Sequence, residues 1–85
     1  MYITVGSVTT ATRLKKRLEA ISGYPAEVVH TPGQINRSGE CSYAVRADDR
    51  LLDIIKPLCA ENGIRIKKIY TEEFINGERV FNDIS

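Results

Sequence analysis

Two cysteines are the residues of this sequence best suited to covalent chemistry. Cys41 and Cys59 stand eighteen positions apart, outside any CxxC pair, and His30 is the only histidine. That inventory gives no disulfide framework and no zinc site, so we expect neither a bound metal nor a cofactor. What remains is the chemistry of a free thiol, which attacks or carries another group only as the thiolate.

The two thiols have different surroundings in the sequence. Cys41 closes a long polar stretch, "TPGQINRSGEC" (31–41), between two strand-like runs, and loops of this length are often functional. Cys59 flanks the apolar stripe of a helix, where a cysteine serves as a small hydrophobe. Cys41 is therefore the candidate reactive thiol. A buried, structural Cys41 is the competing interpretation, because a cysteine that opens a strand often has that role.

Strand-like and helix-like segments alternate around these thiols. The expected strands are residues 2–5, 26–30, 43–47 and 64–70, and the last loses its alternation near Lys67-Lys68, as a β-bulge would cause. Helical spacing links Ala11, Leu14, Leu18 and Ile21, and later Leu51, Ile54, Ile55 and Leu58.

Both helices have recognisable start and stop signals. Hydroxyls in "GSVTT" (6–10) are candidate N-caps of the first helix, and Asp48 or Asp49 caps the second. Gly23 and Gly63 follow the last helical residues, as expected of C-terminal stops.

This order of elements, β-α-β-β-α-β, predicts an α+β fold of the ferredoxin-like sandwich type. A faint repeat supports it, since "LEAISG" (18–23) and "LCAENG" (58–63) each place a helix end before a strand. We expect an antiparallel sheet in the order 4-1-3-2 with both helices on one face. Residues 1–70 form this domain, and residues 71–85 form a C-terminal tail in which Asn76-Gly77 predicts a type I′ β-hairpin.

That topology predicts where the Cys41 thiol points. Strand 3 starts at the end of the sheet where the first strand passes into the first helix, and alternation with Tyr43 and Val45 aims Cys41 towards the helices. We expect the thiol near the amino end of the first helix, whose free N–H groups favour an anion, with the 31–40 loop folded over it. The residues expected to stabilise the thiolate or an anion are Gly6, Ser7, Thr9, Thr10, His30, Thr31 and Arg37.

A helix terminus alone does not ionise this thiol. Lowering its pKa by two units requires about 2.7 kcal/mol of preference for the anion. A helix terminus typically supplies ~0.3–1 kcal/mol and at most ~2 kcal/mol. A second cation is needed, and His30 and Arg37 are the local candidates.

Composition narrows the class of protein. The chain has 85 residues and a net charge of +1, and its apolar runs are far shorter than the ~20 residues of a membrane helix. Its opening, "MYITV", lacks the features of a secretion signal, so we expect a cytoplasmic protein that binds neither nucleic acid nor membrane. The basic residues Arg13, Lys15, Lys16 and Arg17 either form the solvated face of the first helix or receive an acidic partner.

Several short motifs occur together in one order: "GSVTTAT" at the first helix, "PAEVVHTP" before the loop, "CSYAV" after it, and "GIRIKKIY" at the fourth strand. In this respect residues 2–70 resemble a family of small bacterial proteins described as selenium/sulfur carrier-like. The resemblance implies a non-enzymatic carrier that accepts a persulfide or selenopersulfide on Cys41 from a donor protein and passes it to an acceptor. The family's Cys-Gly pair is Cys41-Ser42 here, and the tail from Thr71 lies outside the resemblance.

The competing hypothesis is a non-catalytic ferredoxin-like module that binds a small molecule or another protein. Exposed edges of the sheet or of the tail hairpin would also allow two copies of the chain to pair as a homodimer. One fast and one slow thiol would favour the carrier, and two slow thiols would favour the module.

Overall fold

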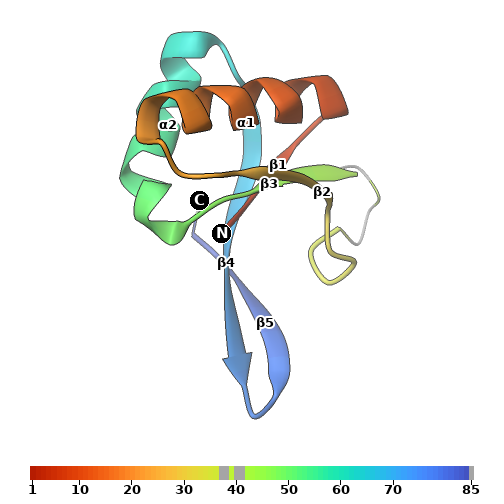
Figure 1. Cartoon of the computed structure of the whole chain (residues 1–85). Coiled ribbons are helices and arrows are strands. Elements are labelled where there is room, and N and C mark those ends of the chain that lie inside the picture. The colour runs from red at the N-terminus through yellow and green to blue at the C-terminus, as the bar shows by residue number, and fades with distance from the viewer. Residues whose placement is uncertain (37–38, 40–41, 85) are drawn as a thin grey trace.

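The computed structural model describes residues 1–36, 39 and 42–84, and within them it has an α+β architecture (Figure 1). The helices α1 (Val8–Ser22) and α2 (Leu52–Asn62) cover one face of an antiparallel sheet. The strands are β1 (Tyr2–Val5), β2 (Glu27–His30), β3 (Tyr43–Arg46), β4 (Ile66–Ile75) and β5 (Glu78–Asp83). The expected class, an antiparallel sheet with two helices, is confirmed.

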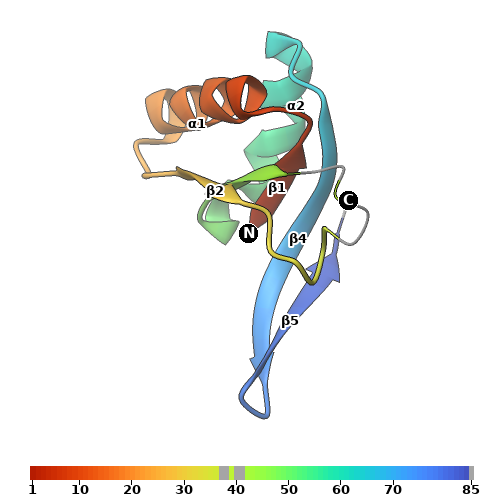
Figure 2. The same cartoon turned by 90° about the vertical axis from the view of Figure 1, so that its right-hand side faces the viewer.

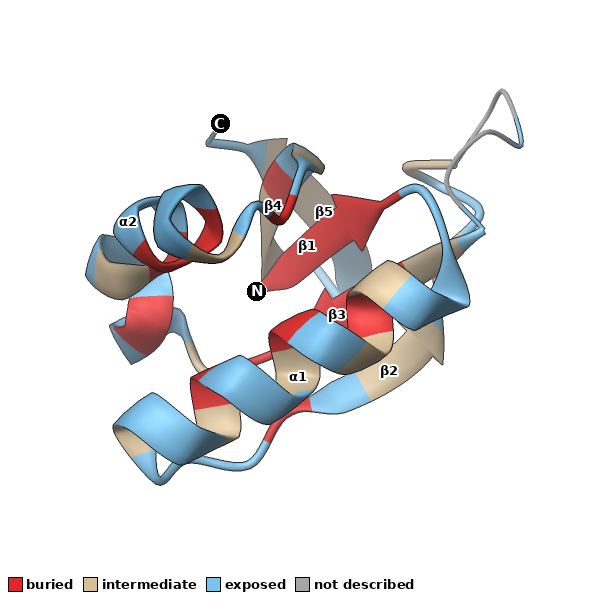
Figure 3. Cartoon of the chain, turned by 90° about the horizontal axis from the view of Figure 1, so that it is seen from above, coloured by how far each residue is buried: buried red, intermediate tan, exposed pale blue. Residues whose placement is uncertain are grey.

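The strands lie in the order β2-β3-β1-β4-β5. The first four strands therefore follow the order 4-1-3-2, with β5 added outside β4. This arrangement places β1 at the centre of the sheet, and Figure 3 shows it buried along its length beneath the helices.

The core lies between the helices and the sheet. Ile3, Val5 and Val45 point from the sheet towards α1 and α2 and are fully buried. The pairing of β1 with β4 shifts register between Thr4 and Val5, which face Lys68 and Ile66 respectively, so Lys67 is the extra residue of a β-bulge. The predicted slip at Lys67-Lys68 is confirmed.

The signals at the helix ends act as predicted except at the start of α2, where Asp48 caps a 3-10 turn (Asp49–Leu51) that leads into the helix and α2 itself has no side-chain cap. Ser7 is the N-cap of α1, where its side chain accepts a 3.1 Å hydrogen bond from the Thr10 N–H. Gly23 and Gly63 close α1 and α2 with φ of 74° and 64°, in the left-handed region that suits glycine. Ile21 departs from the prediction because its side chain is 59% exposed beyond the end of the buried stripe.

β4 is one continuous strand of ten residues, so it crosses the boundary that the sequence suggested after residue 70. It pairs with β5 from Tyr70 opposite Asp83 to Ile75 opposite Glu78. Asn76 and Gly77 form the two-residue turn with φ of 53° and 81°, the positive values that a type I′ turn requires. Figures 1 and 2 show that this β4–β5 hairpin projects away from the helices.

Candidate functional site

The sheet end at Val5 brings together most of the described residues expected to form the site. Val5 lies opposite Tyr43, and α1 begins three residues after Val5, so β3 starts where β1 passes into α1. His30 lies opposite Tyr43 on the other side of β3. Cys41 and Arg37, the expected thiol and one of its two expected cations, lie outside the described residues, and their positions stay predictions.

The start of α1 is open to solvent. Ser7 Oγ accepts from the Thr10 N–H and also shares a 2.9 Å hydrogen bond with Thr10 Oγ1, so these two hydroxyls are engaged in the cap. Gly6 and Thr9 are exposed, and a Cβ placed on Gly6 would meet only the Lys67 side chain, at 4.0 Å. The cap satisfies the Thr10 amide, which leaves the exposed first residues of the helix to face water or an anion.

His30 and Tyr43 form a ring pair at the same end of the sheet. Their ring centroids are 5.2 Å apart and the planes are tilted by 31°. Tyr43 is half-buried against the core, whereas His30 is exposed on the short edge strand β2. The imidazole is therefore held by an aromatic neighbour and remains accessible from solvent.

Thr31 is the most unusual residue at this end. Its side chain is 8% exposed, and its Oγ1 is buried without a hydrogen-bond partner among the described residues. Its backbone N–H donates to the Ser42 carbonyl at 3.0 Å, which ties the first residue after β2 to the residue before β3. Buried hydroxyls are nearly always hydrogen-bonded, so this one is an exception among the described residues.

The described part of the loop turns away from the helices. The N–H groups of Ile35 and Asn36 both donate to the Pro32 carbonyl, which forms a compact turn. Figures 1 and 2 place this turn on the face of the sheet that no helix covers. The predicted cover over the start of α1 is therefore not made by residues 32–36.

Cys59 is a core residue, as the sequence predicted. It lies in α2, is 4% exposed and packs in the cluster between the helices and the sheet. Burial raises the pKa of its thiol, because the apolar surroundings disfavour the thiolate. Cys59 therefore stays protonated and inaccessible at neutral pH.

A basic groove runs along the first turns of α1. It has a volume of about 340 Å³ and is lined by Val8, Thr9, Thr12, Arg13 and Lys16. Arg13 donates to the Asn62 carbonyl at 2.9 Å, which fixes its guanidinium between the ends of the two helices. Val8 is 47% exposed, so the groove combines positive charge with an apolar wall.

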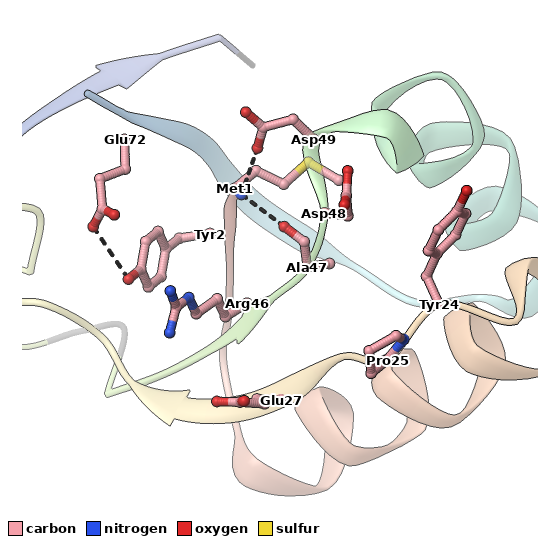
Figure 4. A pocket seen from close by; sticks show the side chains of 10 residues that line it. All are labelled: Met1, Tyr2, Tyr24, Pro25, Glu27, Arg46, Ala47, Asp48, Asp49 and Glu72. Carbon is pink, nitrogen blue, oxygen red and sulfur yellow. Dashed lines mark hydrogen bonds and ion pairs between the residues drawn. The ribbon is translucent and has the colours of Figure 1, made fainter. Parts of the chain in front are cut away.

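A second hollow, of about 510 Å³, lies at the opposite end of the sheet (Figure 4). It is lined by Met1, Tyr2, Tyr24, Pro25, Glu27, Arg46, Ala47, Asp48, Asp49 and Glu72. Several of its carboxylates already have partners. The Met1 amino group donates to Asp49 at 2.7 Å, and hydrogen bonds from Arg50 lower the pKa of Asp48. Sequence patterns did not indicate this hollow, because its walls come from four separated segments.

The hairpin is attached to the domain by a cluster of side chains that the sequence analysis also missed. The Tyr2 and Phe81 rings meet edge to face with centroids 5.4 Å apart. The Arg79 guanidinium lies 4.8 Å from the Phe81 ring centroid, donates to Tyr2 Oη at 2.6 Å and forms an ion pair with Glu72. The sequence did contain a signal for this cluster, namely the spacing of Glu72, Arg79 and Phe81 around a two-residue turn.

The described residues show no group of three or more His, Cys, Asp or Glu side chains that could hold a metal ion. Within the same part of the chain, none of the helices has the length and apolar character needed to span a membrane. Among the described residues, the candidate site at this end of the sheet consists of the exposed start of α1 and the His30–Tyr43 ring pair, with Thr31 next to His30.

These features define a small α+β protein with a long connection between its second and third strands and a cysteine, Cys59, in its core. A family model described as putative Se/S carrier protein-like matches residues 1–71, and the chain belongs to that family. No curated protein and no solved structure matches it. The match ends inside β4, so β5 lies wholly beyond the matched residues.

Proposed function

We propose that this protein carries sulfur or selenium on the Cys41 thiol, receiving the atom from one protein and delivering it to another. Family membership supports a carrier, and the burial of Cys59 supports the choice of thiol. This burial is the observation that carries the proposal. Of the two cysteines, one is sealed in the core with a raised pKa, which leaves Cys41 for exchange.

The transfer is a thiol–disulfide type of exchange that needs no external oxidant. The Cys41 thiolate attacks the terminal sulfur of a donor persulfide, forms a new S–S bond at Cys41 and breaks the S–S bond of the donor. The donor leaves as a thiolate and takes up the proton. With a donor selenopersulfide, the same attack on the terminal selenium moves that atom to Cys41. An acceptor nucleophile then removes the terminal atom and returns Cys41 to the thiol.

In this proposal the site residues stabilise the negative charge of the group carried on Cys41. The exposed start of α1 favours an anion, and His30 or Arg37 supplies the further positive charge that the helix terminus lacks. Thr31, also expected to stabilise the anion, continues the β2–β3 ladder opposite Ser42, so side-chain alternation directs its hydroxyl to the face of the sheet opposite His30. The hydroxyls of Ser7 and Thr10 act indirectly, because they hold the helix start in place.

The basic groove on α1 suits the partner proteins. Arg13, Lys16 and the exposed Val8 would receive an acidic segment with one apolar side chain, at the sheet end where β3 begins. Charge reversal at Lys16 should then slow transfer in a salt-dependent way without changing the reactivity of the thiol towards small reagents.

The test is mass spectrometry of the intact protein after incubation with a persulfide donor. Wild type and Cys59→Ser should gain one sulfur atom, and Cys41→Ser should gain none. Cys41→Ser should leave the free energy of unfolding nearly unchanged, whereas Cys59→Ser should lower it, because a hydroxyl would replace a buried thiol. A labile sulfur found on Cys59, or none on either cysteine, would contradict the carrier function.

A second candidate function has its own support in the hollow at the far end of the sheet. This hollow has a volume of about 510 Å³, and its walls contain carboxylates as well as the Arg46 guanidinium. These features suit a small charged molecule. A binding module of this kind predicts that both thiols react slowly with a disulfide reagent. A carrier predicts that Cys41 reacts far faster than Cys59, so the titration separates the two functions.

A further inference from the structure

β5 forms an edge of the sheet and has a regular backbone. Its six residues pair one to one with β4, and the Ile84 N–H continues the ladder by donating to the Ile69 carbonyl at 2.9 Å. The outer side of such a strand offers a row of backbone groups to any further strand. β5 lies beyond the residues matched by the family model.

The opposite edge of the sheet is protected in ways that β5 is not. β2 has only four residues and is flanked by Pro25 and Pro32, which have no N–H to donate. β5 contains no proline, and its charged residues, Glu78, Arg79 and Asp83, carry both signs, so opposite charges can face each other across a contact between two copies. Of the two edges, β5 is therefore the one suited to further pairing.

The hydrogen-bond pattern fixes which backbone groups face outward. In an antiparallel pair, alternate residues of a strand point their N–H and C=O groups towards the same neighbour. Ile84 bonds inward to β4, so Arg79 and Phe81, at odd numbers, direct their backbone groups away from β4. An antiparallel partner strand would have to bond to these two residues.

We propose that β5 pairs antiparallel with β5 of a second copy of the chain, with Phe81 opposite Phe81 on the two-fold axis. In this register the Arg79 side chain of one copy lies opposite the Asp83 side chain of the other, on the same face of the sheet. Opposite charges on directly facing residues stabilise a strand pair. Within each copy Arg79 already forms an ion pair with Glu72, and Asp83 forms one with Lys68 at 3.2 Å, so the facing side chains would extend these ion pairs across the contact.

Neighbouring registers lack this match. Moving the axis to Val80 places Arg79 opposite Phe81, and moving it to Arg79 places two guanidinium groups opposite each other, which is unfavourable. The dimer joins the two sheets edge to edge into one continuous sheet. An isologous contact of this kind closes on itself and does not propagate into a fibre.

Sedimentation analysis over a range of protein concentrations tests the pairing. Wild type should form dimers, and Phe81→Pro should raise the dimer dissociation constant at least about tenfold, equivalent to ~1.4 kcal/mol, because it lacks the outward N–H. Phe81→Ala is the matched control, since it also loses the ring but keeps the N–H, and it should remain closer to wild type. A wild type that stays monomeric at every concentration, or a Phe81→Pro that dimerises like Phe81→Ala, would overturn the proposal.

Disulfide trapping tests the register independently of these variants. In a Cys41→Ser background, Phe81→Cys should cross-link under mild oxidation, because facing residues of a hydrogen-bonded pair lie about 5.5 Å apart at Cα, within disulfide range. Val80→Cys, one residue away and on the other face, should not cross-link. The reverse pattern, or no cross-link at either position, would refute the proposed pairing.

Discussion

Replacing Thr31 by valine should stabilise this protein, although Thr31 is a buried polar residue at the candidate site. The two side chains have nearly the same shape, so the change removes a hydroxyl and little else. Thr31 Oγ1 is buried, and no described residue hydrogen-bonds to it. A buried polar group without a partner costs about 1–3 kcal/mol, and the valine variant should recover a good part of that amount.

Thr4→Val is the matched control. Thr4 is also a buried threonine, and it differs from Thr31 in that its hydroxyl has hydrogen-bond partners. Thr4 is 2% exposed, and its Oγ1 accepts from the Lys68 N–H at 3.0 Å and donates to the Lys68 carbonyl at 3.3 Å, beside the β-bulge. Valine here removes both hydrogen bonds between the Thr4 hydroxyl and the Lys68 backbone. We therefore expect a loss of about 1–3 kcal/mol from the same substitution that is favourable at Thr31.

Urea unfolding of both variants and wild type measures these changes, with the slope of the free energy against denaturant checked for constancy. In thermal unfolding, each kcal/mol corresponds to a Tm shift of about 4–8 °C for a domain of this size. A Thr31→Val variant that unfolds more easily than wild type would refute the reasoning. It would mean that the hydroxyl has a partner in the native protein.

Three further predictions concern other parts of the fold. The pKa of Cys59 is raised in the folded state, so above its ordinary value of 9.0 the unfolded chain loses this proton before the folded chain does. The free energy of unfolding should then fall by at most about 1.4 kcal/mol for each pH unit above that value. This dependence on pH should disappear in Cys59→Ala. If the variant shows the same dependence as wild type, the effect belongs to other groups. Gly77→Ala should destabilise the hairpin by about 1 kcal/mol or more, because φ at Gly77 is 81°. Amide hydrogen exchange should then accelerate more in β5 than in β1, and equal changes in both strands would contradict a local effect. Arg79→Ala should make the hairpin more sensitive to proteolysis than Arg65→Ala, its exposed control, because Arg79 contacts Tyr2, Glu72 and Phe81; equal sensitivity would argue against this role.

The features that the sequence predicted well depend on local physics. A hydroxyl before an apolar stripe, a glycine after it and an Asn-Gly pair between strands each require a particular backbone conformation within a few residues. This explains the agreement at Ser7, Gly23 and Asn76-Gly77. The bulge was also visible, because Ile66 and Ile69 cannot both face the core in an uninterrupted strand.

The missed features depend on contacts between distant residues. The sequence analysis ended the fourth strand at residue 70 and set the hairpin apart as a tail, yet β4 continues through Glu72 and Glu73, because Tyr2 packs against Phe81 and Arg79 from the centre of the sheet. Local patterns do not record that contact across more than seventy positions. In the same way, the isolation of the Thr31 hydroxyl depends on how β2 and β3 approach each other, which residue spacing does not express.

The β-bulge at Lys67 has a consequence for how this strand can change length. A single-residue deletion elsewhere in β4 would transfer every following side chain to the other face of the sheet, because side chains alternate. Loss of Lys67 would instead join Ile66 directly to Lys68, which already face Val5 and Thr4 as consecutive pairs. The strand can therefore lose this residue and keep Ile69 in the core and the hairpin in phase. Among related chains, we expect natural insertions and deletions in this strand to concentrate at this position.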